Sequence, residues 1–98
     1  MELRFTREAD AQLASRREWW RDNRREPKIF DEELAEASRR LTATPSNFPI
    51  FAVRRGRTIH RCLLPRVGTH LYFEIDEGAR VVVVVLAWGA VRGRKPPL

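Results

Sequence analysis

The residue types best suited to chemistry gather on two neighbouring predicted strands and in the tail after the last strand. Arg61 lies on one strand, His70 and Tyr72 lie on the next, and Trp88 closes the last one. The tail adds three cations: Arg92, Arg94 and Lys95. Arginine and lysine bind phosphate or carboxylate groups, tyrosine and tryptophan stack on flat rings, and histidine transfers protons near neutral pH.

Two interpretations of this set stay open. Arg61, His70, Tyr72 and Arg92 could form a metal-independent ribonuclease site, with a base for the 2′-hydroxyl, cations for the phosphate and an acid for the leaving oxygen. In the structural interpretation, Arg61 anchors a strand, His70 is a half-buried cross-strand partner and the tail docks a protein. The residues predicted to contact a target are Arg61, Tyr72, Trp88, Arg92, Arg94 and Lys95.

Other catalytic signatures are absent from the sequence. There is no phosphate-binding glycine loop, no G-x-S-x-G elbow and no H-E-x-x-H motif. His60 and His70 fall on different strands and could not make a metal site by themselves. Cys62 is the single cysteine, so it can form neither an internal disulfide nor a cysteine-based metal site, and we expect a buried thiol. The sequence therefore predicts no metal and no cofactor.

The positive charge is confined to the second half of the chain. Residues 1–41 carry ten Lys/Arg and ten Asp/Glu, whereas residues 42–98 carry nine Lys/Arg and three Asp/Glu, which accounts for the net charge of +6. A field of one sign favours an anionic partner, either a nucleic acid or an acidic protein. A solubilising surface is the alternative explanation.

The first half of the chain predicts a strand and two helices. Leu3 and Phe5 alternate with charged residues, and Thr6 is suited to cap a helix that follows at once. Apolar residues then recur at helical spacing, with Trp20 expected in the core and Trp19 partly exposed. The second helix has a basic end and a buried face: Phe30, Leu34, Ala37 and Leu41. Two such helices joined by a few residues predict an antiparallel hairpin.

The second half predicts an antiparallel sheet. Strands are expected over residues 58–64, 70–76 and 80–88, with a short edge strand over 50–54. In the strand 70–76, Leu71, Phe73 and Ile75 should face the helices while the other face forms a candidate working surface. The unbroken valines at 81–85 predict an interior strand, between the first strand and the strand 70–76, with cover on its outer face.

Length and polarity set the overall expectations. The 98 residues suit one α+β domain with two layers: a helical hairpin at about 7–42, a sheet at about 50–88 and a basic tail at 89–98. The longest apolar run falls short of the roughly 20 residues that span a bilayer, and the N-terminus is charged where a signal peptide would be apolar. We expect a cytoplasmic protein.

Five segments together resemble the RelE/ParE family of toxins from bacterial type II toxin–antitoxin pairs. They are FTREADAQL, EWWRDNR, FDEELAEA, HLYFEID and VLAWGAVRGRKPPL, and they extend over nearly the whole chain. The ending is the most specific piece, with Ala87, Trp88 and Gly89 closing a β-branched strand. The resemblance implies a strand, a helical hairpin and an antiparallel meander, and a growth-arresting toxin held inactive by a cognate antitoxin.

The branches of the family imply different targets. RelE-like members cleave messenger RNA on the ribosome with sheet arginines and a tyrosine or histidine near the C-terminus. Here His70 stands at the position resembling the central arginine, Arg92 keeps a comparable place, and the tail ends in Pro97 and Leu98. ParE-like members inhibit DNA gyrase and resemble this chain more closely. A gyrase inhibitor is therefore the favoured hypothesis; a ribosome-dependent endonuclease and a non-toxic partner-binding scaffold are the alternatives.

The antitoxin would need two features to suit this chain. An apolar helix or strand laid over the sheet and hairpin would shield the valine-rich strand, and acidic groups would neutralise the basic tail.

Overall fold

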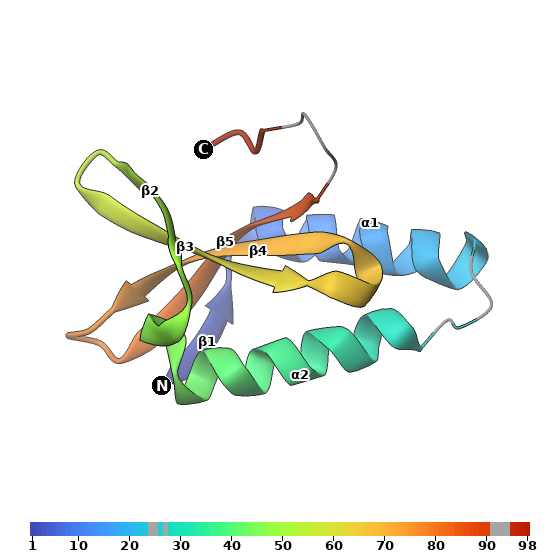
Figure 1. Cartoon of the computed structure of the whole chain (residues 1–98), viewed down its shortest axis with the longest axis horizontal. Coiled ribbons are helices and arrows are strands. Elements are labelled where there is room, and N and C mark those ends of the chain that lie inside the picture. Colours follow the sequence, from blue (N-terminus) through green and yellow to red (C-terminus); the bar gives the residue numbers. More distant parts are fainter. Residues whose placement is uncertain (24–25, 27, 91–94) are drawn as a thin grey trace.

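The chain folds into two helices packed on one face of a five-stranded sheet (Figure 1). The structure is a computed structural model, and it describes residues 1–23, 26, 28–90 and 95–98. The strands and helices follow in the order β1 (Glu2–Phe5), α1 (Arg7–Asn23), α2 (Ile29–Ala43), β2 (Ile50–Arg54), β3 (Arg57–Leu64), β4 (Thr69–Asp76) and β5 (Val81–Gly89). Single 3-10 turns at Pro45–Asn47 and Pro65–Val67 precede β2 and β4.

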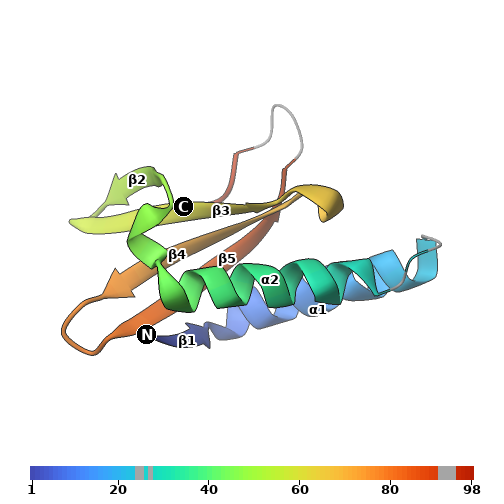
Figure 2. The ribbon, with the colours of Figure 1, turned by 60° about the horizontal axis from the view of Figure 1, so that its bottom comes forward.

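The sheet has the strand order β1-β5-β4-β3-β2, and the valine-rich β5 lies between β1 and β4 as predicted. Strands β2 to β5 form the expected antiparallel meander. Strand β1 adds a parallel pair to this meander, because it runs parallel to β5, so the complete sheet is mixed. The two helices share one face of the sheet, which Figure 2 shows from the side. The fold class is α+β in two layers.

The passage from β1 into α1 is sharp because Thr6 satisfies both elements. Its hydroxyl accepts a hydrogen bond from the Ala9 amide at 3.2 Å, as a helix cap does, and donates one to the Val85 carbonyl at 3.2 Å. Its own amide donates to the Val84 carbonyl at 2.9 Å. One residue thus ends the parallel strand and begins the helix against β5.

The main core lies between the helices and the inner face of the sheet. Leu71 and Phe73 of β4 are fully buried there, and Ile75 packs at its margin, which confirms the predicted alternation. Phe30, Ala37 and Leu41 of α2 face the same core, whereas Leu34 is only partly buried. The Cys62 thiol is also buried here, and burial raises its pKa to about 11.

Of the two tryptophans of α1, Trp19 is partly exposed as expected, whereas Trp20 is less buried than expected. Trp20 packs on the core but is only partly buried, and Trp19 remains 48% exposed. Their rings meet edge to face at 5.7 Å between centroids. Both lie in the last turns of α1, and this end of the helix extends past the described strands of the sheet (Figure 2).

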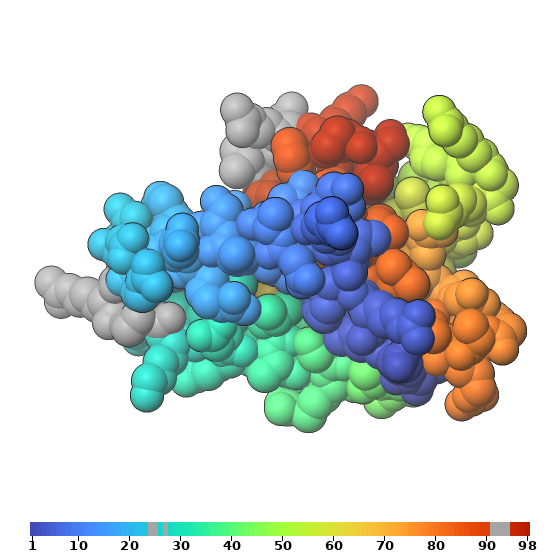
Figure 3. Space-filling view, turned by 180° about the vertical axis from the view of Figure 1, so that it is seen from behind, coloured from blue at the N-terminus to red at the C-terminus, as the bar shows by residue number. Residues whose placement is uncertain are grey.

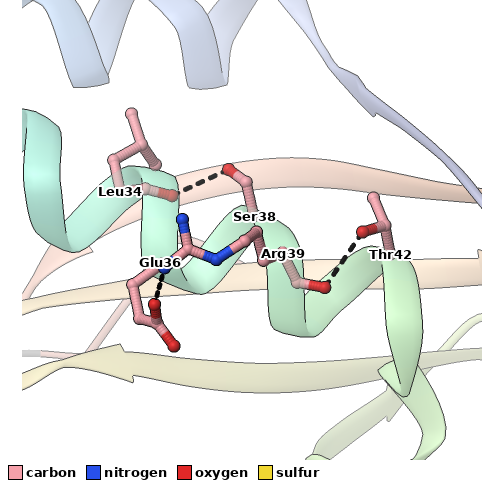
Figure 4. A network of polar contacts seen from close by, with 5 residues as sticks. All are labelled: Leu34, Glu36, Ser38, Arg39 and Thr42. Atoms are coloured by element: carbon pink, nitrogen blue, oxygen red, sulfur yellow. Dashed lines mark hydrogen bonds and ion pairs between the residues drawn. The ribbon is translucent and has the colours of Figure 1, made fainter.

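Several polar contacts lie within α2 itself (Figure 4). The Ser38 hydroxyl donates to the Leu34 carbonyl at 2.8 Å, and the Thr42 hydroxyl donates to the Arg39 carbonyl at 2.9 Å. Arg39 also pairs with Glu36, three residues earlier, as predicted for a solvated helical face. In the described part of the chain, no helix is long and apolar enough to cross a membrane.

Candidate functional site on the outer face of the sheet

The sheet brings four of the predicted site residues together on the face opposite the helices. Arg61 of β3 lies directly opposite Tyr72 of β4, and His70 of β4 lies opposite Trp88 of β5. Residues directly opposite each other on paired strands point to the same face. The ring centroids of His70 and Tyr72 are 5.9 Å apart. These four side chains therefore form one row across three strands, from Arg61 to Trp88.

Tyr72 is not at the surface, where the prediction that it contacts a target required it to be. It is only 2% exposed and forms a second core with Ile59 and Leu86. The edge strand β2 lays Phe51 over it, with ring centroids 4.9 Å apart in an edge-to-face contact. The Arg61 guanidinium in turn lies 5.3 Å from the centre of the Phe51 ring. Phe51, which the sequence analysis did not select, is therefore the residue that covers Tyr72.

A β-bulge explains how β5 contributes side chains both to the main core and to the second core. Tyr72 pairs with Leu86 but Phe73 pairs with Val84, so Val85 is an extra residue in β5. Val82 and Val84 accordingly face the helices, while Val85 and Leu86 both face outward and join the second core. At Val85, the predicted cover on the outer side of the valine strand is thus made by the second core of this chain itself.

The described end of the tail also lies against this face. Leu98 packs on the second core, and the Arg54 guanidinium donates to the Leu98 carbonyl at 3.4 Å. Lys95 is exposed. Arg92 and Arg94, the other tail cations of the predicted site, lie outside the described residues.

The charge state of His70 follows from its surroundings. Partial burial lowers the pKa of its imidazole, and the positive charge of neighbouring Arg61 lowers it further. The ring is therefore neutral at pH 7 and can accept a proton. The accessible part of this face combines a neutral imidazole, a guanidinium, the half-buried Trp88 and the exposed aliphatic Leu63. Such a surface suits both anion contact and apolar docking.

Removing the Arg61 charge should raise the pKa of His70. In Arg61→Gln, the pKa of His70 is expected to rise but to stay below the ordinary histidine value of 6.5, because the burial that is the larger cause persists. Proton NMR titration of the imidazole measures this change. Arg57→Gln, on the same strand but paired with Glu74 at 2.7 Å, is the matched control and should have a smaller effect. An equal rise in both variants would contradict the assignment to Arg61.

The same shift gives the stability a pH dependence of known sign. Because the folded pKa of His70 is below its unfolded value, the unfolded state binds more protons as the pH falls through about 6.5. The contribution of His70 is thus fully present above that pH and is lost as the pH falls towards the lowered folded value. His70→Gln should reduce the loss of unfolding free energy between pH 7 and pH 5, as urea titrations at each pH would measure. An unchanged slope would contradict this.

Comparisons with known proteins agree with the fold. No protein-family model matches the chain, and no curated protein matches it. Among solved structures, a chain described as "Chromosomal ParDE TA system from P. aeruginosa" superposes with a TM-score of 0.71. The match covers 93% of this chain and 97% of that one, at 15% sequence identity. At that identity the likeness shows the fold, so the predicted RelE/ParE-like architecture is confirmed.

Proposed function

We propose that this chain is the toxin component of a type II toxin–antitoxin pair, which arrests growth by binding DNA gyrase and is neutralised by a cognate antitoxin. The observation that carries the proposal is the match of fold over nearly the full length of both chains with a chain from a ParDE toxin–antitoxin system. The sequence resemblance, which rests on segments along the whole chain, points in the same direction.

The composition of the outer face supports a binding role over a catalytic one. Tyr72 lies beneath Phe51, so it is poorly placed to donate a proton to a leaving group. Arg61, Trp88 and Lys95 remain as contact residues, and Leu63 adds an exposed apolar group. Arginine and tryptophan are the residue types that dominate the energy of protein interfaces.

A supercoiling assay with purified gyrase tests this proposal. The protein should block supercoiling and leave a translation extract active, and Arg61→Gln should weaken the block about tenfold or more, as loss of an interface arginine does. Arg39→Gln removes the same charge from the exposed face of α2 and serves as the control, with little effect.

Other outcomes would favour the alternatives. The neutral imidazole of His70 beside Arg61 is the observation that favours a ribosome-dependent messenger RNA endonuclease. If gyrase supercoiled normally while translation stopped, and His70→Ala restored translation, that second function would replace the first. If overexpression caused no growth defect at all, the chain would be a non-toxic partner-binding scaffold.

A further inference from the structure

Among the described residues, no strand pairs with the edge of β5 beyond the point where β1 ends. Strand β1 pairs with Val81–Val84, but β5 continues to Gly89. Beyond that point the side chains of α1 and its cap take the place of a strand. The Thr6 hydroxyl donates to the Val85 carbonyl, and the Gln12 side-chain oxygen accepts from the Ala87 amide at 2.8 Å. Because strand residues alternate in direction, the amide of Gly89 points to the same edge as that of Ala87.

A groove runs along this edge between α1 and β5. It has a volume of about 410 Å³ and is lined by Ala11, Gln12, Ser15 and Arg16 of the helix and by residues 87–89 of the strand. Most of these side chains are small, so another backbone can approach β5 closely. Ser15 and Arg16 also line a second hollow of about 280 Å³, which extends to Trp19 and Trp20. Figure 3, which views the molecule from behind, shows α1 at the surface.

Arg16 lines both hollows, and the hydrogen bonds that it makes to described residues all go to neutral oxygens. Its Nε donates to the Thr69 hydroxyl at 2.6 Å, and its terminal nitrogen donates to the carbonyls of Val67 and Gly68 at 3.2 and 3.4 Å. Within the described residues, no carboxylate lies close enough to form an ion pair with it. Arg16 is partly buried, so its charge is partly removed from water, and this burial lowers the pKa of the guanidinium.

We propose that this groove is a strand-addition site for an extended acidic segment of the antitoxin. The segment would displace the Gln12 side chain, pair its backbone with the free edge at Ala87 and Gly89, and place a carboxylate against Arg16. Strand addition takes its affinity from backbone hydrogen bonds, and an arginine–carboxylate contact adds both affinity and specificity. The identity of the partner rests on the proposed function, whereas the edge, the groove and the unpaired charge do not.

A peptide titration tests the chemistry of the site without the antitoxin. The probe is the blocked hexapeptide Val-Glu-Val-Glu-Val-Thr, added to the ¹⁵N-labelled full chain, and the control peptide has glutamine in place of both glutamates. We expect the largest amide shifts and new protection from exchange at Ala87 and Gly89. The glutamine peptide should bind about tenfold more weakly, as expected for the loss of a charge-assisted contact.

Three variants distinguish specific binding of the peptide in the groove from a general effect of charge on binding. Gln12→Ala removes the competing acceptor and should strengthen peptide binding about threefold, a change that simple destabilisation would not produce. Ser15→Glu puts a carboxylate beside Arg16 and should abolish binding. Ala14→Glu adds the same charge at the adjacent exposed position, which does not line the groove, and should change binding less than twofold.

Several outcomes would overturn the inference. They are the absence of shifts at Ala87 and Gly89 at millimolar peptide, equal binding of the two peptides, or equal losses in Ser15→Glu and Ala14→Glu. The peptide titration does not involve gyrase, so it tests the groove separately from the proposed function. Peptide binding without an effect on supercoiling would contradict only the proposed function. A block of supercoiling without peptide binding would contradict only the strand-addition site.

Discussion

Phe73→Ala is expected to lower the free energy of unfolding by about 3–5 kcal/mol, the range for deleting a buried aromatic side chain. Phe73 has no exposed surface and lies in the main core, where the His60 ring stacks on it at 5.3 Å and the Phe48 ring meets it edge to face at 5.8 Å. Urea denaturation followed by circular dichroism measures the loss.

The matched control for this prediction is Leu63→Ala on the neighbouring strand β3. Leu63 is 45% exposed on the outer face of the sheet, so its truncation should cost less than about 1 kcal/mol. Similar losses in the two variants would mean that the inner layer is not the main source of stability.

Arg16→Leu is expected to cost about 2–3 kcal/mol, because it removes a charged donor from three oxygens at once. The Arg16 guanidinium holds the 3-10 turn before β4 against α1 through Thr69, Val67 and Gly68. Thr69 is fully buried, and its remaining bond is to the Val67 carbonyl at 3.0 Å. Leucine would restore apolar packing but none of these hydrogen bonds, so the turn should loosen as well.

Arg17→Leu provides the comparison, since it removes the same charge one residue along the helix. Arg17 pairs with Asp31 at 2.6 Å in an exposed position, and such pairs contribute up to about 1 kcal/mol. Thermal and urea unfolding of both variants should rank Arg16 well above Arg17. Hydrogen exchange should show faster exchange near Gly68 in Arg16→Leu alone, and equal stability of the two variants would refute the role of Arg16.

Much of the fold follows from local pattern. Thr6 is suited to cap a helix from its place between an alternating strand and a helical stripe, and the structure shows it doing so. Leu71 and Phe73 face the helices because alternation at period two places them on one side of a strand. The run of valines also predicted that β5 lies in the interior of the sheet, since such a strand needs neighbouring strands at both edges.

The sequence was enough to predict which residues share the candidate site, but not which of them are exposed to solvent. Arg61, His70, Tyr72 and Trp88 do share one face, since opposed residues of neighbouring strands point the same way. Which of them reaches solvent depends on Phe51, which β2 brings over Tyr72 from twenty-one residues earlier in the chain. The sequence pattern around Tyr72 does not predict that Phe51 covers it.

The sequence by itself determined the order of the elements, the inner faces of the strands and the location of the +6 charge after residue 41, because these depend on residue types and short spacings. Only the tertiary structure decided the bulge at Val85, the burial of Tyr72 and the attachment of Arg16 to a turn fifty residues away. Each of these results from contacts between distant segments, whose geometry is set by packing and hydrogen bonding across the fold and not by the periodicity of any one segment.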